Sequence, residues 1–142
     1  MTGNRYEGKG LAEAVYAAVP ALKGFDIFSG LYCIAIAIFG IVVFAALNEY
    51  RAIAPKLLIS MYITSIAVTF VSMIWLSGII GGAEKTVIYG ETYEIAGEMY
   101  RSYIDLSAMN NVVTNFVSMG VSLALAIYNY RYYSERDELF LK

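Results

Sequence analysis

The chain has 142 residues, of which 59% are hydrophobic and only 15% are charged, with a formal net charge of −2. A soluble domain carries about a quarter of its residues as charged groups because its surface must be hydrated, so this composition favours a chain that resides in lipid. The net charge gives no electrostatic case for nucleic acid as a partner, and the absence of histidine excludes His-ligated haem, the usual His-containing zinc and copper sites, and Ser-His or Cys-His nucleophile pairs.

Residues 1–26 are predicted to form a lead-in followed by a short interfacial helix. Three glycines fall in residues 1–10, which we expect to be exposed. The apolar stretch Leu11–Val19 is too short to cross a bilayer, so we expect a helix that lies flat at the interface or packs against the other helices. Pro20 and Gly24 then turn the chain inward. Acidic residues within and before this stretch argue against a cleaved signal peptide, so we expect the segment to be retained.

Three long runs without Asp, Glu, Lys or Arg predict membrane-spanning helices. A helix needs about 20 mainly apolar residues to cross the roughly 30 Å hydrocarbon core of a bilayer. Within the three runs we expect spans at residues 27–47, 57–80 and 106–130. The alternative is a set of buried helices in a soluble assembly, such as a capsid whose subunits cover one another.

The short link of residues 49–56 is expected to join the first two spans as an antiparallel hairpin. Pro55 suits the first turn of the second helix, where its missing N–H costs nothing. This places the N-terminus and residues 83–105 on one side of the membrane, and the link and the C-terminus on the other. Basic residues are denser in the link and the polar tail of residues 131–142, which favours that side as cytoplasmic or its equivalent.

Residues 83–105 are predicted to be an extramembrane loop and an amphipathic helix that runs without a break into the third span. From Glu91 onward apolar residues recur every three to five positions, which is typical of such a helix. A helix from Glu91 to Glu138 would be roughly 70 Å long, about twice the hydrocarbon thickness. The predicted fold class is therefore all-α, an integral membrane protein with three transmembrane helices, a short N-terminal interfacial helix and a long third helix overhanging the membrane.

The outer part of this predicted helix has an aromatic side and an acidic side. Tyr93, Tyr100 and Tyr103 are expected on one face, and aromatic residues are enriched in the cores of interfaces, so we predict that they contact a partner. Carboxylates at helical spacing suit acid–base chemistry or a hard cation, but such a run is more often a solvated face. We expect these carboxylates in water on the opposite face: Glu91, Glu94 and Glu98.

Small and polar residues repeat at helical spacing within each span. Small residues let helices approach closely in lipid, and Asn or Ser side chains add hydrogen bonds that contribute about 0.6 kcal/mol each. The predicted helix-packing seam comprises Asn111, Asn115, Ser118, Ser122 and Ala126 in the third span, Ser29, Cys33 and Ala37 in the first, and Ser60 and Thr64 in the second. The alternative is a polar lining for an ion or proton path, but no ionisable residue joins the seam.

These features predict a non-catalytic accessory subunit of a multi-subunit membrane protein complex, with other membrane subunits and lipid as partners. We expect no catalytic residues, metal, cofactor, nucleic acid or soluble small-molecule substrate. Two alternatives stay open. One is a homo-oligomeric channel or transporter subunit with an Asn/Ser-lined path, and the other is a structural protein of a viral envelope or capsid.

Overall fold

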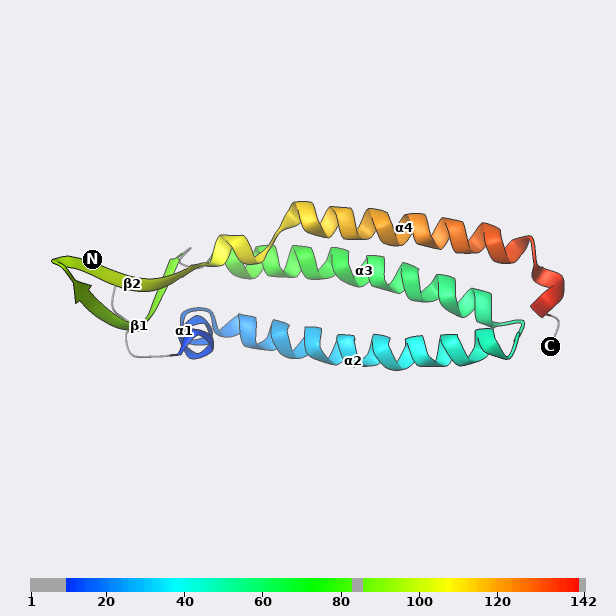
Figure 1. The fold of residues 1–142 in the computed structure, drawn as a ribbon, viewed down its shortest axis with the longest axis horizontal. Coiled ribbons are helices and arrows are strands. Elements are labelled where there is room, and N and C mark those ends of the chain that lie inside the picture. Colours follow the sequence, from blue (N-terminus) through cyan, green and yellow to red (C-terminus); the bar gives the residue numbers. More distant parts are fainter. Residues whose placement is uncertain (1–9, 83–85, 141–142) are drawn as a thin grey trace. The chain divides into compact units, whose positions relative to one another are not determined.

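A computed structural model describes residues 10–82 and 86–140 of the chain (Figure 1). Its helices are α1 (Leu11–Ala18), α2 (Pro20–Asn48), α3 (Ala54–Gly81) and α4 (Val112–Ser134), with two short 3₁₀ helices, η1 (Leu106–Met109) and η2 (Asp137–Phe140). The strands β1 (Thr86–Ile95) and β2 (Glu98–Asp105) pair antiparallel. The predicted lead-in up to residue 9, loop residues 83–85 and the last two residues of the predicted tail lie outside the described residues.

The chain divides into two compact units, which are described separately. The hairpin unit is the described part of Met1–Phe28 and Ile74–Asn111, and the helical unit is the described part of Ser29–Met73 and Val112–Lys142. Helices α2 and α3 therefore contribute residues to both units.

Three helical segments are long and apolar enough to cross a membrane: Pro20–Asn48, Ala54–Gly81 and Leu106–Ser134. Each contains one of the three predicted spans, so this part of the prediction is confirmed at the level of helix length and composition. The helix α2 begins well before residue 27, because Pro20 suits a first helical turn and the charges of Lys23 and Asp26 do not stop a helix. Pro55 lies in the first turn of α3, as predicted.

The hairpin unit has a buried apolar core assembled from four separate stretches of the chain. Leu22 at the start of α2, Val87 on β1 and Leu106 in η1 are each at most 1% exposed. Ala14 and Val15 cover this core from α1, which thus packs against other elements, the second of its two predicted placements. The remaining buried members are Val19, Leu76 and Ile80.

One hydrogen bond and two aromatic contacts hold the helix ends of the hairpin unit in place. The Tyr16 hydroxyl donates a hydrogen bond of 2.6 Å to Asp26, and this bond, with partial desolvation and the nearby negative charge, raises the pKa of Tyr16 above its ordinary value. The ring of Trp75 on α3 lies 5.5 Å from that of Phe25 in an edge-to-face arrangement, and 5.4 Å from Phe28. The start of α2 and the end of α3 are therefore held together by aromatic packing.

The β-hairpin replaces the predicted amphipathic helix, so the prediction of a continuous helix from Glu91 to Glu138 is wrong. The predicted all-α class is confirmed in part, because helices make up most of the described chain and the hairpin is the departure from it. The strands are joined by the two residues Ala96 and Gly97, with φ angles of 56° and 83°. Positive φ at both positions is the signature of the type I′ turn that matches strand twist. The helix α4 has 23 residues and is about 34 Å long, so it has no overhang of the predicted size.

Local chemistry explains why this segment is not helical. Residues 86–89 are Thr, Val, Ile and Tyr, β-branched and aromatic residues that favour strands. At the end of β2, the Asp105 carboxylate accepts a hydrogen bond of 2.9 Å from the Ser107 backbone N–H and caps η1. After η1, the Asn110 side chain donates a 2.6 Å hydrogen bond to Ser77 on α3. Helix α4 therefore starts afresh at Val112.

The predicted aromatic helix face of Tyr93, Tyr100 and Tyr103 does not exist. Tyr93 lies opposite Tyr100 in the strand ladder, whereas Tyr100 and Tyr103, three residues apart on β2, leave opposite faces because side chains alternate along a strand. Both of these β2 rings are exposed, and the Tyr100 hydroxyl donates a 3.1 Å hydrogen bond to Glu98. Glu94 is also exposed, and the side chains of Tyr93 and Glu91 lie outside the described part.

In the helical unit, α3 lies between α2 and α4 (Figure 1). Helix α2 ends in a Schellman motif, in which the Arg51 N–H bonds to the Ala46 carbonyl at 3.0 Å and Tyr50 has a positive φ of 52°. Few apolar residues are covered. Each candidate span has a most apolar stretch, and the buried share of that stretch is 11% in Pro20–Asn48, 0% in Ala54–Gly81 and 6% in Leu106–Ser134.

Candidate functional site

The predicted seam on α4 is divided between two faces of the helix. Asn115 and Ser122 are half-buried and Ala126 is buried, so these residues face the rest of the helical unit. Ser118 is exposed. Asn111 is also exposed, and it precedes the helix, since α4 begins at Val112. Three of the five predicted seam positions thus lie on the side of α4 that packs within the chain.

The predicted seams of the first two spans lie mostly on outward faces of the helical unit. Ser29 is half-buried, but Cys33 and Ala37 on α2 are exposed. Ser60 and Thr64 on α3 are exposed as well. The covered face of α2 comprises Tyr32, Ile36, Phe39, Val43 and Ala46. Cys33 and Ala37 are therefore next to, and not on, the face of α2 that meets the rest of the chain.

Hydrogen bonds in the helical unit follow a pattern that sequence reasoning missed. The Tyr32 hydroxyl on α2 donates a 3.1 Å hydrogen bond to the Ser65 hydroxyl on α3, which links the two helices. Ser60 and Asn129 instead donate to carbonyls of their own helices, Leu57 and Leu125, each at 2.8 Å. A tyrosine in mid-span, flanked by apolar residues, was the signal for a polar partner on a neighbouring helix.

Glycines in the three long helices are not used for close packing within the chain. A methyl group built onto Gly30 or Gly40 of α2, or onto Gly120 of α4, would meet no atom within 4 Å. Glycine in a helix interior costs about 1 kcal/mol relative to alanine, so it usually has a packing reason. The described residues of this chain do not supply that reason at these positions.

An aromatic cluster joins the α2–α3 link to the C-terminal residues of the helical unit. The Phe140 ring lies 5.7 Å from that of Tyr50 and 5.4 Å from that of Tyr133. Phe140 is only 8% exposed, so the predicted polar tail folds back onto the helices. Arg136 lies over the Tyr132 ring at 4.0 Å and donates a 3.2 Å hydrogen bond to its carbonyl. The link and the tail thus lie at the same end of this unit, as the predicted topology requires.

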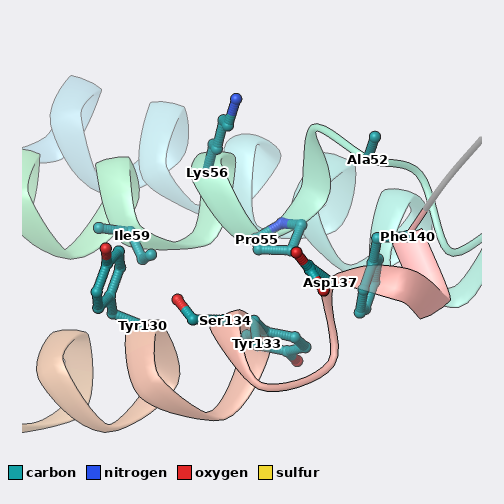
Figure 2. A pocket seen from close by; sticks show the side chains of 9 residues that line it. All are labelled: Ala52, Pro55, Lys56, Ile59, Tyr130, Tyr133, Ser134, Asp137 and Phe140. Carbon is teal, nitrogen blue, oxygen red and sulfur yellow. The ribbon is translucent and has the colours of Figure 1, made fainter.

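A cavity of about 210 Å³ lies beside this cluster, between the start of α3 and the end of α4 (Figure 2). Figure 2 shows side chains of both helices directed toward one another, with Ile59 near Tyr130. The lining residues are Ala52, Pro55, Lys56, Ile59, Tyr130, Tyr133, Ser134, Asp137 and Phe140. The wall is therefore mainly apolar and aromatic, with two opposite charges.

The two charged residues of the cavity are available to a ligand. Lys56 and Asp137 are both exposed, and within residues 10–82 and 86–140 neither forms an ion pair. The contrast is Arg51 in the link, whose guanidinium is paired with Glu49 through a 2.6 Å hydrogen bond from Nε. In Figure 2 the Lys56 side chain projects away from Tyr130 and Tyr133, so its charge lies at the rim.

The mainly apolar wall with a charge of each sign suits the binding of an amphiphilic group. Within the described residues, no three His, Cys, Asp or Glu side chains gather as a metal ion would require. The thiol of Cys33 is exposed on α2. Comparisons of the chain with known protein families, with curated proteins and with solved structures found no match.

Proposed function

We propose that this protein is an integral membrane protein that crosses the bilayer three times and serves as a non-catalytic subunit of a larger membrane complex. The observation that carries the membrane part is the exposure of the three long apolar helices, of which at most 11% of any apolar stretch is buried. Moving one such side chain out of water is worth about 1.5–3 kcal/mol, so a surface of this kind requires an apolar surrounding. Lipid supplies it along the helices.

The small residues on outward faces support a protein partner in addition to lipid. Gly30, Cys33 and Ala37 follow one another on an exposed face of α2 at spacings of three and four residues. On α4, the least apolar of the candidate spans, Ser118 and Gly120 are exposed. Small and hydroxyl-bearing residues are what helices use to approach each other in lipid, and the chain itself leaves these faces uncovered.

The non-catalytic part of the proposal rests on composition. The chain has no histidine and one cysteine, so the common nucleophile–base pairs cannot be assembled. The cavity of the helical unit offers a lysine and an aspartate at its wall, which suit ligand binding. A homo-oligomeric channel and a viral structural protein are the competing proposals. The number of chain types in the assembly, together with its form as a closed ring or an extended lattice, separates all three.

The test introduces a larger side chain on the outward face of α4. Gly120→Leu should release partner chains during gentle solubilisation, because leucine would occupy the space that a neighbouring helix needs. The fold of the single chain should survive, since no atom of the chain lies within 4 Å of the added Cβ. Val121→Leu is the matched control, an adjacent exposed position that is already bulky, and should leave the assembly intact.

The composition of the wild-type assembly decides between the proposals. Several different chains in the purified complex support an accessory subunit. One chain type in a closed ring supports the channel, and one chain type in an extended lattice supports the viral protein. An assembly unchanged by Gly120→Leu would contradict the partner surface on α4.

A further inference from the structure

We propose that the cavity of the helical unit binds the headgroup of a phospholipid that carries an ammonium group. In this arrangement Asp137 and the rings of Tyr133 and Phe140 hold the ammonium, and Lys56 meets the phosphate at the rim. The inference rests on the proposed membrane location, and it adds a ligand site that packing against other subunits does not require.

The cavity lies where a lipid headgroup would be. Pro55 lies in the first turn of α3 and Tyr133 in the last turn of α4, so the cavity borders the same end of two candidate spans. Tyrosines are enriched at the level of the headgroups, where the ring is in apolar surroundings and the hydroxyl is hydrated. The site is thus at the depth of a headgroup, not of the acyl chains.

The size of the cavity fits part of a lipid. Sites for drug-sized ligands measure about 300–1,000 Å³, and this cavity of about 210 Å³ is smaller. An ammonium group with its short ethyl linker occupies a space of this order, while the acyl chains stay outside. Exposed apolar side chains on α3 and α4, such as Ile63 and Ile127, continue from the cavity along both helices and would contact those chains.

The cavity wall has the chemistry that binds an ammonium ion. The rings of Tyr133 and Phe140 meet edge-to-face at 82°, so the two aromatic planes form a corner in the wall. A cation over an aromatic face is attracted by the ring quadrupole, and aromatic pockets are a common means of recognising quaternary ammonium groups. Asp137 adds a negative charge at the same wall. The neighbouring Arg136 lies over Tyr132 and leaves this charge to a ligand.

The same charges disfavour an anionic lipid. Phosphatidylglycerol has the phosphate that Lys56 would meet but no ammonium for Asp137, so the carboxylate would face a negatively charged lipid without compensation. Asp137 therefore provides the preference for a lipid that carries an ammonium group over an anionic lipid, and Lys56 contributes affinity for every phospholipid. This division of roles predicts different consequences for the two substitutions.

The experiment measures binding of single lipids to the delipidated full-length protein in detergent by native mass spectrometry. Phosphatidylethanolamine should bind about tenfold more tightly than phosphatidylglycerol with the same acyl chains, the ratio expected when the contacts of the ammonium with the carboxylate and the aromatic rings together contribute about 1.4 kcal/mol. Asp137→Asn should reduce the preference to about twofold or less, whereas Lys56→Gln should weaken both lipids to a similar extent. Glu138→Gln, an adjacent exposed position that does not line the cavity, is the control and should retain the preference.

Equal affinity of the wild-type protein for both lipids would overturn the site, as would loss of the preference in Glu138→Gln. Flotation of the protein with vesicles after alkaline extraction tests the membrane location independently. A protein that floats but shows no headgroup preference refutes the lipid site alone. A protein that does not float refutes the proposed function and the site with it.

Discussion

The hairpin unit buries apolar side chains in a core of its own, whereas the helical unit leaves many of its apolar side chains exposed. In the hairpin unit, Leu22 and Leu106 are almost completely buried in a core to which helices, a strand and a 3₁₀ helix all contribute. In the helical unit, which is richer in apolar residues, side chains such as Leu31 and Ile38 are exposed. Leu22 and Leu31 belong to the same helix, α2, yet their exposed fractions are 1% and 63%.

This difference indicates that the two units of the chain suit different surroundings. A core of its own lets the hairpin unit tolerate water, because part of its apolar surface, including Leu22, Val87 and Leu106, is already covered. The helical unit has hardly any such core, and under the proposed function lipid or neighbouring helices cover its apolar surface. Matched substitutions, one in each unit, test this contrast.

The largest expected effect is on the core of the hairpin unit. Leu22→Ala should lower the free energy of unfolding by about 3 kcal/mol, because it removes a buried side chain and leaves a cavity. Leu31→Ala on the same helix should lower it by less than about 1 kcal/mol, since no protein core loses contacts. Reversible unfolding of the full-length protein in mixed micelles measures both. Equal losses would show that the two units are packed alike.

A charge should distinguish the units in the reverse direction. Ile38→Arg near the middle of α2 should disfavour membrane insertion by about 2.5–3.5 kcal/mol, the cost of arginine at the centre of a span. Met99→Arg on the exposed side of β2 should leave insertion unchanged. The inserted fraction in microsomes, scored with engineered glycosylation sites, provides the measurement. Efficient insertion of the Ile38→Arg chain would contradict the account of α2.

Each unit has one non-glycine residue with positive φ, among the residues described, and the two should respond differently to glycine. Ala96→Gly in the hairpin turn should stabilise the hairpin by about 1 kcal/mol, because glycine adopts this conformation without the steric cost of a Cβ. Tyr50→Gly should give no gain, since the relief is offset by loss of the ring contact with Phe140. Hydrogen exchange of the hairpin amides and thermal unfolding report the two effects. A gain at Tyr50 equal to that at Ala96 would show that the Tyr50–Phe140 contact contributes nothing.

The smallest effect is expected at the polar face of α4. Asn115→Leu should lower the free energy of unfolding of the helical unit by about 0.6 kcal/mol, because Asn115 is half-buried against the rest of this unit and one hydrogen bond between membrane helices contributes that much on average. Reconstituted vesicles should have background ion permeability with either side chain. A selective conductance that this substitution abolishes would favour the channel proposal.

The three long helices were predictable because a run that is to cross lipid must meet a strict requirement. Every backbone group must be satisfied within the span, so a long charge-free run has few alternatives to a helix. The end of such a run nevertheless shows where charged residues begin and not where the helix ends. Helix α2 extends back to Pro20 through Lys23 and Asp26. Charges stop a span from being buried in lipid but do not unwind it.

The hairpin was not predicted because its turn and its alternation are both irregular. Ala96-Gly97 replaces the Asn-Gly or Asp-Gly pair that usually marks a two-residue turn. The pairing also shifts between Tyr89 and Tyr93, so apolar residues do not alternate evenly along β1. Spacings of three to five then resemble those of a helix. The strand-forming residues at 86–89 were the better signal.

The cavity could not be derived from the sequence because its residues come from segments 52–59 and 130–140, which only tertiary packing brings together. One local signal existed. Phe140 lies in a segment of mainly charged residues, and a lone aromatic residue in a polar tail indicates that the tail returns to an apolar surface.

Labelling of single cysteines in intact and permeabilised membrane vesicles tests the central claim, three membrane crossings, most directly. With Cys33 replaced by serine, cysteines introduced at Met99 and at Glu138 should react with a membrane-impermeant reagent from opposite sides of the membrane. A cysteine at Ile38 should react from neither side, because it would lie within the hydrocarbon core. Labelling of Met99→Cys and Glu138→Cys from the same side, or reaction of Ile38→Cys with the aqueous reagent, would contradict the account.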